Sequence, residues 1–89
     1  MNSLSFKIFY HPKTFDKIPA KRRDQIKEAL KELKDPLPGG NKSKIEGYKE
    51  EIYRLRIGNY RAMYRIDKKE VFVYEILTAE QAHKKYDRL

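Results

Sequence analysis

With 89 residues, the chain is long enough for one small domain, which we expect to span residues 1–89. It carries 21 Lys and Arg residues against 13 Asp and Glu residues, and this net charge of +8 favours an anionic partner, most simply a nucleic acid, with a membrane surface as the competing interpretation. No apolar run approaches the roughly 20 residues that span a bilayer, the first residues contain no signal-peptide core, and the lack of cysteine excludes disulfides and thiol chemistry. We therefore expect a cytoplasmic protein without a membrane partner.

The first half of the chain predicts one strand and two helices. Residues 4–10 alternate apolar and polar side chains, which is typical of a strand. Pro12 fits the first position of a short helix over 12–18, and a second helix is expected over 20–34, where apolar residues recur at helical spacing. Pro36 ends this second helix, because the residue before a proline disfavours the helical conformation.

The second half of the chain predicts three further strands. Residues 36–44 are rich in proline and glycine and are expected to form a loop. Strands at about 50–57 and at 60–66 are joined by a Gly-Asn turn. The almost wholly apolar stretch 71–77 predicts a central strand that is buried on both faces.

A last helix is expected over 79–86, with Thr78 as its candidate N-cap. The elements therefore predict an α+β fold in the order β-α-α-β-β-β-α. We expect an antiparallel, partly mixed sheet of four strands, with an N-terminal helical hairpin on one face and a short C-terminal helix. The opposite face of the sheet is expected to be open and basic.

Arginines follow the two strands on either side of the Gly-Asn turn. Because side chains alternate between the two faces of a strand, Leu55 and Ile57 are expected to face the helices, and the arginines are expected to converge on the open face. These arginines are Arg54, Arg56, Arg61 and Arg65. Guanidinium groups bind phosphate with paired hydrogen bonds and stack on aromatic rings, so the cluster indicates an anion-binding surface. The alternative is that they are ordinary surface residues paired with Glu50, Glu51 or Glu75.

The segment Tyr53–Asp67, which reads Tyr-Arg-Leu-Arg-Ile-Gly-Asn-Tyr-Arg-Ala-Met-Tyr-Arg-Ile-Asp, resembles the RelE family of toxins from type II toxin–antitoxin modules. The resemblance extends over nearly the whole chain, from the Lys-Ile-Glu-Gly stretch at 44–47 to a basic C-terminal helix that ends in Tyr86. The Tyr-Arg-Leu-Arg-Ile-Gly-x-Tyr-Arg motif is shared by the wider RelE/ParE superfamily and does not separate its ribonuclease branch from its gyrase-inhibiting branch. The resemblance implies a compact microbial ribonuclease fold, cleavage of mRNA in the ribosomal A site, and an acidic, partly disordered RelB-like antitoxin as partner in a heteromeric complex.

The resemblance also implies roles for individual residues. Arg61 matches the arginine at the scissile phosphate, and Arg54 and Arg56 match residues that hold the RNA backbone and stabilise its charge. Lys44 matches a basic residue of the preceding loop, and Tyr86 matches a general base. The alternatives for Tyr86 are that it stacks on an RNA base or that it only docks the last helix. The other residues with an expected contact to the substrate are Arg65, Lys84 and Lys85.

Two positions depart from the family pattern. The family's basic residue just before the loop glycine is Glu46 here, and the positions directly after the last strand, Thr78–Ala82, contain no arginine. Glu46 and His83 are therefore candidate substitutes for an acid or a base, since the charge of a histidine shifts readily near pH 7. Tyr86 could act as a base only if nearby cations lower its pKa from the ordinary value near 10. The cations expected to do this are Lys84, Lys85 and Arg88.

The expected chemistry requires no metal or other cofactor. RNA carries its own nucleophile, the 2′-hydroxyl beside the scissile phosphate, and arginines can stabilise the charge of the transition state. The sequence has no Cys/His ligand set, and its acidic residues lack a metal-nuclease spacing. Two other functions stay open, a ParE-like inhibitor that binds DNA gyrase and a non-catalytic basic RNA-binding module.

Overall fold

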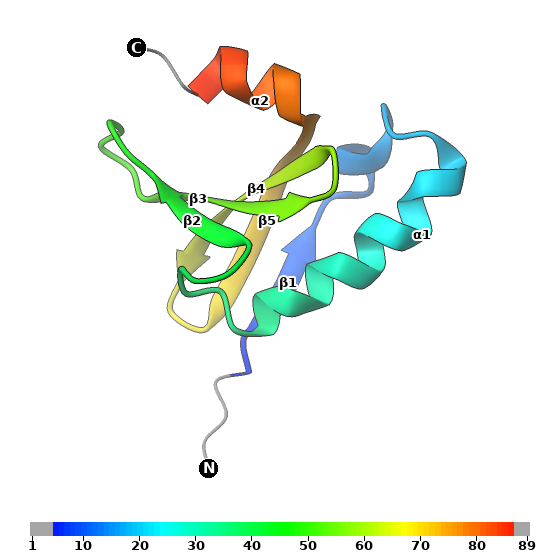
Figure 1. Cartoon of the computed structure of the whole chain (residues 1–89). Coiled ribbons are helices and arrows are strands. Elements are labelled where there is room, and N and C mark those ends of the chain that lie inside the picture. The colour runs from blue at the N-terminus through cyan, green and yellow to red at the C-terminus, as the bar shows by residue number, and fades with distance from the viewer. Residues whose placement is uncertain (1–4, 87–89) are drawn as a thin grey trace.

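A five-stranded sheet forms the centre of the molecule, and helices lie on both of its faces (Figure 1). The structure is a computed structural model that describes residues 5–86. The elements in chain order are β1 (Lys7–Tyr10), the 3-10 helix η1 (Pro12–Phe15), α1 (Ala20–Ala29), the 3-10 helix η2 (Leu30–Lys34), β2 (Lys42–Ile45), β3 (Ile52–Ile57), β4 (Tyr60–Asp67), β5 (Glu70–Thr78) and α2 (Ala79–Tyr86).

The strand order in the sheet is β1-β5-β4-β3-β2, with β1 parallel to β5 and all other neighbours antiparallel. The prediction of a partly mixed sheet is therefore confirmed, but the prediction of four strands is wrong. The fifth strand is β2, which lies in the segment expected to be a loop. Its sequence Lys-Ser-Lys-Ile has no apolar alternation to reveal it, and it is a strand because its backbone pairs with β3 at the edge of the sheet.

The main core lies between the sheet and the helical segment α1–η2. Leu33 of η2, Leu55 of β3 and Tyr64 of β4 are fully buried there, and Phe15 of η1 also belongs to this cluster. The predicted N-terminal helical hairpin is in fact a single 3-10 turn followed by one helix whose end tightens into 3-10 geometry. No helix among the described residues is long and apolar enough to cross a membrane.

The C-terminal helix α2 lies on the opposite face of the sheet from α1 (Figure 1). Tyr86 of α2 packs there with Ile45, Ile52 and Met63 in a second, smaller cluster. The face that was expected to be open is therefore partly covered. Thr78 is confirmed as the N-cap of α2, because the backbone amide of Gln81 donates to its Oγ1 atom at 3.2 Å and its own amide donates to Oε1 of Gln81 at 3.0 Å.

Strand β5 is central, as predicted, but it is buried on one face only. Val71 and Val73 point into the core, whereas Phe72 and Tyr74 are about two-fifths exposed. The pairing with β4 shifts by one residue after Val73, so Tyr74 is an extra residue in β5, which is a β-bulge. An apolar run alone could not distinguish burial on two faces from an apolar strand with one solvent-exposed aromatic face.

Candidate functional site

Three arginines from β3 and β4 surround one open pocket on the sheet face that carries α2. Arg56 and Arg61 are directly opposite each other in the two strands, and Arg54 lies two residues before Arg56. Together with Gly40, Asn41 and Ser43 they line a pocket of about 310 Å³, which we call the arginine pocket. The predicted division of β3 and β4 into a core face and an arginine face is confirmed, since Leu55 and Ile57 belong to the main core.

Two hydrogen bonds hold the side chain of Arg61 in the arginine pocket. Its Nη1 atom donates to the carbonyl oxygens of Gly58 and Tyr60, both at 2.8 Å, which fixes the guanidinium beside the β3–β4 turn. Partial burial, followed by repulsion from Arg54 and Arg56, lowers the pKa of Arg61 from its ordinary value. Among the described residues, no carboxylate lines the pocket. The site is therefore poised to accept a multiply charged anion such as a phosphate.

The loop before β2 forms the other wall of the arginine pocket, and several backbone bonds hold it in place. The amide of Arg56 donates to the carbonyl of Asn41 at 2.9 Å, and Gly39 and Lys42 exchange two backbone bonds around Gly40. Gly40 has a φ of 58°, a left-handed conformation that favours glycine. Sequence reasoning missed this wall, and the Gly-Gly-Asn turn was the only available signal for it.

Arg65 lies outside the arginine pocket, so three of the four arginines converge rather than all four. Its Nη2 atom is 2.7 Å from Oε1 of Glu50, as the alternative interpretation expected for a surface arginine, and its guanidinium lies 5.8 Å from the centre of the Tyr74 ring. Met63 separates Arg61 from Arg65 along β4 and is fully buried in the cluster beneath α2. The alternation of side chains along β4 predicted the correct face of the sheet for these arginines. It could not show that α2 covers the middle of that face.

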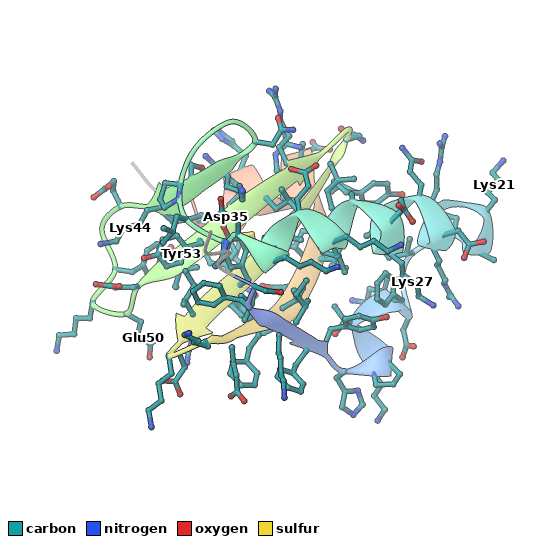
Figure 2. All side chains as sticks on the ribbon, turned by 90° about the horizontal axis from the view of Figure 1, so that it is seen from below. Lys21, Lys27, Asp35, Lys44, Glu50 and Tyr53 are labelled. Carbon is teal, nitrogen blue, oxygen red and sulfur yellow. The ribbon has the colours of Figure 1, made fainter. Side chains whose placement is uncertain are left out.

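Lys44 also lies away from the arginine pocket. It belongs to β2 rather than to a loop, and it pairs with Tyr53, whereas its neighbour Ser43 pairs with Arg54. Since side chains alternate along a strand, Ser43 faces the arginine pocket and Lys44 projects from the opposite face, near Tyr53 (Figure 2). The Nζ atom of Lys44 is 3.9 Å from a carboxylate oxygen of Glu51.

Tyr86 is buried, with 8% of its surface exposed, and it docks α2 onto the sheet. Its hydroxyl donates to Oε1 of Glu75 at 2.6 Å and lies 3.3 Å from the hydroxyl of Tyr74, and its ring contacts Tyr48 edge to face. Burial, and then the hydrogen bond to Glu75, raise the pKa of Tyr86. The expectation that neighbouring cations lower this pKa is therefore wrong for this structure.

The cations around Tyr86 have carboxylate partners of their own. Lys85 forms an ion pair with Glu75 at 2.7 Å, and Lys84 lies 3.9 Å from a carboxylate oxygen of Glu80. Arg88 lies outside the described residues. Among the charged groups near the Tyr86 hydroxyl, the carboxylate of Glu75 is therefore the one that accepts its hydrogen bond.

Neither of the substitute acid–base candidates lines the arginine pocket. Glu46 follows β2 and His83 lies on α2, and both side chains are exposed. Within residues 5–86, no group of three or more His, Cys, Asp or Glu residues is arranged to hold a metal ion. The arrangement can bind and polarise a phosphate, but none of the residues from 5 to 86 brings a side-chain base into the pocket.

Comparison with known proteins identifies the family. Residues 11–83 match the family described as the ParE toxin of type II toxin–antitoxin systems, parDE. No curated protein sequence matches the chain.

Two solved structures share the fold. The first is a crystal structure of an archaeal RelE–RelB complex from Pyrococcus horikoshii OT3, with 22% identity, a TM-score of 0.65, and coverage of 83% of this chain and 94% of that chain. The second is a RelB–RelE antitoxin–toxin complex from Methanococcus jannaschii, with 20% identity, a TM-score of 0.62, and coverage of 88% and 98%. The resemblance to the RelE/ParE superfamily is confirmed: the chain belongs to the ParE toxin family of type II toxin–antitoxin systems, and it has the fold of the RelE toxins.

Proposed function

We propose that this toxin is a ribosome-dependent endoribonuclease that cleaves mRNA in the A site and so arrests translation. The observation that carries the proposal is the arginine pocket, in which three guanidinium groups meet without a carboxylate among the described lining residues. An RNA phosphate in this pocket would be contacted by three side chains whose positive charges otherwise repel one another.

The proposed reaction needs no metal. The 2′-hydroxyl gives its proton to solvent, the 2′-oxygen attacks the adjacent phosphorus, and the bond to the 5′-oxygen breaks. The 5′-oxygen then takes a proton from solvent, so the products are a 2′,3′-cyclic phosphate and a 5′-hydroxyl. Arg61, fixed by the carbonyls of Gly58 and Tyr60, contacts the scissile phosphate, while Arg54 and Arg56 stabilise its additional negative charge. Tyr86 can take the proton of the 2′-hydroxyl only after its bond to Glu75 breaks, so in the free toxin its role is to dock α2.

A second candidate function is inhibition of DNA gyrase without any cleavage. Two observations favour it: the matching family is the ParE toxin family, and no side-chain base of the described residues lines the arginine pocket. In this case the arginines would serve binding alone.

For either activity we propose that an acidic, RelB-like antitoxin covers the basic surface in a heteromeric complex. The net charge of +8 supports such a partner, and both structural relatives were solved as complexes of RelE with RelB. An acidic segment over the arginine pocket would exclude RNA directly, because the two anions would compete for the same guanidinium groups.

Primer extension on mRNA from ribosomes incubated with the purified toxin tests the proposal, with free mRNA as a control and a gyrase supercoiling assay run in parallel. We expect cleavage on the ribosome and unchanged supercoiling. Arg61→Ala should lower the cleavage rate about 100-fold or more while ribosome binding is retained. Arg22→Ala, which removes the same charge from α1, should cleave like the parent.

Cleavage by Arg61→Ala at the parental rate would refute the assignment of Arg61. Inhibition of supercoiling without cleavage products would establish the gyrase function instead.

A further inference from the structure

Three exposed aromatic side chains form a strip on the same sheet face as the arginine pocket. Phe9 of β1 and Phe72 of β5 are paired in register, and their rings stack with centres 5.4 Å apart. Tyr74 follows Phe72 in the bulge of β5. Phe72 is also paired with Arg65, which places the strip on the arginine face of the sheet. We call Phe9, Phe72 and Tyr74 the aromatic strip.

The aromatic strip is not part of the protein core. Phe9, Phe72 and Tyr74 are 42%, 39% and 41% exposed, and none of them belongs to either hydrophobic cluster. Exposed rings of this size are costly to leave in water, so a group of three on one face indicates a binding surface.

Two cationic side chains lie beside aromatic rings on this face, and each also pairs with a carboxylate, Arg65 with Glu50 and Lys85 with Glu75. Phe72 and Tyr74 line a depression of about 590 Å³ together with Arg65, Ile66 and Asp67. The guanidinium of Arg65 lies over the ring of Tyr74, and farther along the same face the Nζ atom of Lys85 lies 5.7 Å from the centre of the Tyr86 ring. Aromatic rings beside cations are the usual means of holding unpaired nucleic-acid bases, which stack on rings and on guanidinium planes.

We propose that the aromatic strip binds unpaired bases of the RNA strand whose scissile phosphate occupies the arginine pocket. This inference rests on the proposed RNA substrate. Arg61 and Arg65 lie on the same face of β4 and are four residues apart, about 13 Å along an extended strand. Met63 between them is buried beneath α2, so one single strand that contacts both surfaces passes beside α2. The net charge of +8 favours a polyanion on this face over an apolar protein segment.

A non-cleavable probe tests binding separately from catalysis. The probe is a short 2′-O-methyl oligoadenylate that contains 2-aminopurine, because the methylated backbone lacks the attacking hydroxyl and stacking quenches 2-aminopurine fluorescence. We expect the parent toxin to bind the probe and to quench it. The double variant Phe72→Leu with Tyr74→Leu should bind about tenfold more weakly or worse and lose the quenching, since it keeps apolar bulk but removes the rings.

Tyr10→Leu is the matched control, because Tyr10 is 40% exposed on the same strand as Phe9 but packs edge to face against Phe15 of the core. It should bind and quench like the parent. Unchanged affinity and quenching in the double variant would overturn the proposal, as would failure of the parent to bind the probe. A double variant that still binds RNA but no longer binds the antitoxin would show that the aromatic strip docks a protein. That result would also overturn the proposal. If the probe results are as expected but the toxin does not cleave mRNA on the ribosome, only the proposed enzymatic function is contradicted.

Discussion

The hydroxyl of Tyr64 joins the hydrophobic core to the loop that forms one wall of the arginine pocket. Tyr64 is fully buried, its ring stacks on Tyr53 with centres 5.5 Å apart, and its hydroxyl donates to the carbonyl oxygen of Pro36 at 2.8 Å. The same loop is held by Lys42, whose Nζ atom donates to the carbonyl of Asp35 at 2.6 Å. One buried side chain thus anchors residues that reach the anion site.

Removal of this hydroxyl should destabilise the fold. In Tyr64→Phe the carbonyl of Pro36 loses a buried partner, which costs about 1–3 kcal/mol of unfolding free energy. Urea unfolding at neutral pH measures this loss. Tyr60→Phe is a suitable control, because Tyr60 is half-buried against the same core and its hydroxyl forms no hydrogen bond with the described residues. Equal stability of the two variants would contradict the role of the Tyr64 hydroxyl.

At alkaline pH, the difference in unfolding free energy between the parent and Tyr64→Phe should change in one definite direction. Burial, and then the charges of Tyr53 and Asp35, raise the pKa of Tyr64 above its ordinary value of 10.0. Above about pH 10 the unfolded chain therefore loses this proton while the folded chain keeps it, and the unfolded state is favoured. The stabilisation by Tyr64 is complete below that pH and declines above it. The difference between the parent and Tyr64→Phe should shrink accordingly, and a difference that grows would refute this account.

At the scale of elements, the carboxylate of Glu75 links β5 to the last turn of α2. This carboxylate accepts from Tyr86 at 2.6 Å and pairs with Lys85 at 2.7 Å, and the hydroxyl of Tyr48 adds longer bonds to the carbonyls of Lys85 and Tyr86 at 3.4 Å and 3.5 Å. The bulge at Tyr74 makes the two shorter bonds possible, because it shifts the register of β5 and brings Glu75 opposite Met63 on the face beneath α2.

Glu75→Gln should loosen α2 without unfolding the sheet. The neutral amide keeps the shape of the side chain but loses the charge that holds Tyr86 and Lys85. Amide hydrogen exchange of residues 79–86 should become faster, while exchange in β3 and β4 stays unchanged. Glu80→Gln on α2 itself is the control, because the pair of Glu80 with Lys84 is largely exposed and contributes little. Unchanged protection of α2 in Glu75→Gln would contradict the proposed attachment.

Elements with a clear apolar period could be predicted from the sequence, and elements that depend on neighbouring strands could not. Strands β3 and β4, their two faces and the start of α2 follow from alternation and from the Thr78 cap. Strand β2 has no such pattern and exists because β3 offers it a free edge. The apolar run 71–77 does not show which of its faces is covered, so the exposure of Phe72 was missed, and the bulge after Val73 is equally invisible in it.

The candidate site likewise contains residues whose positions the sequence predicts and residues whose positions it does not. The arginine face could be predicted, because Arg54, Arg56 and Arg61 depend only on the period of two strands. The places of Lys44 and Tyr86 could not, because one depends on the register of β2 and the other on where α2 crosses the sheet. Family resemblance supplied a role for each residue but not its distance from the others.

At the scale of the whole molecule, the positive charge is spread over several surfaces but only part of it can contact one RNA strand. Basic residues such as Lys21 and Lys27 lie along α1 (Figure 2), on the opposite face of the sheet from α2 (Figure 1). The arginine pocket concentrates three of the cations on one spot. Total charge and local charge should therefore have different effects on RNA binding, and their salt dependence can separate them.

The affinity for a single-stranded RNA should fall linearly with salt concentration on a double logarithmic plot, with a slope of about −0.7 for each phosphate contact. Arg56→Gln removes a contact in the arginine pocket, so its slope should be less steep by about 0.7. Lys44→Gln removes the same charge from the neighbouring strand but on the opposite face, and its slope should equal that of the parent. Fluorescence anisotropy of the non-cleavable oligoadenylate at several salt concentrations measures all three slopes. If both variants changed the slope equally, binding would follow net charge alone, and the arginine pocket would not be the phosphate site.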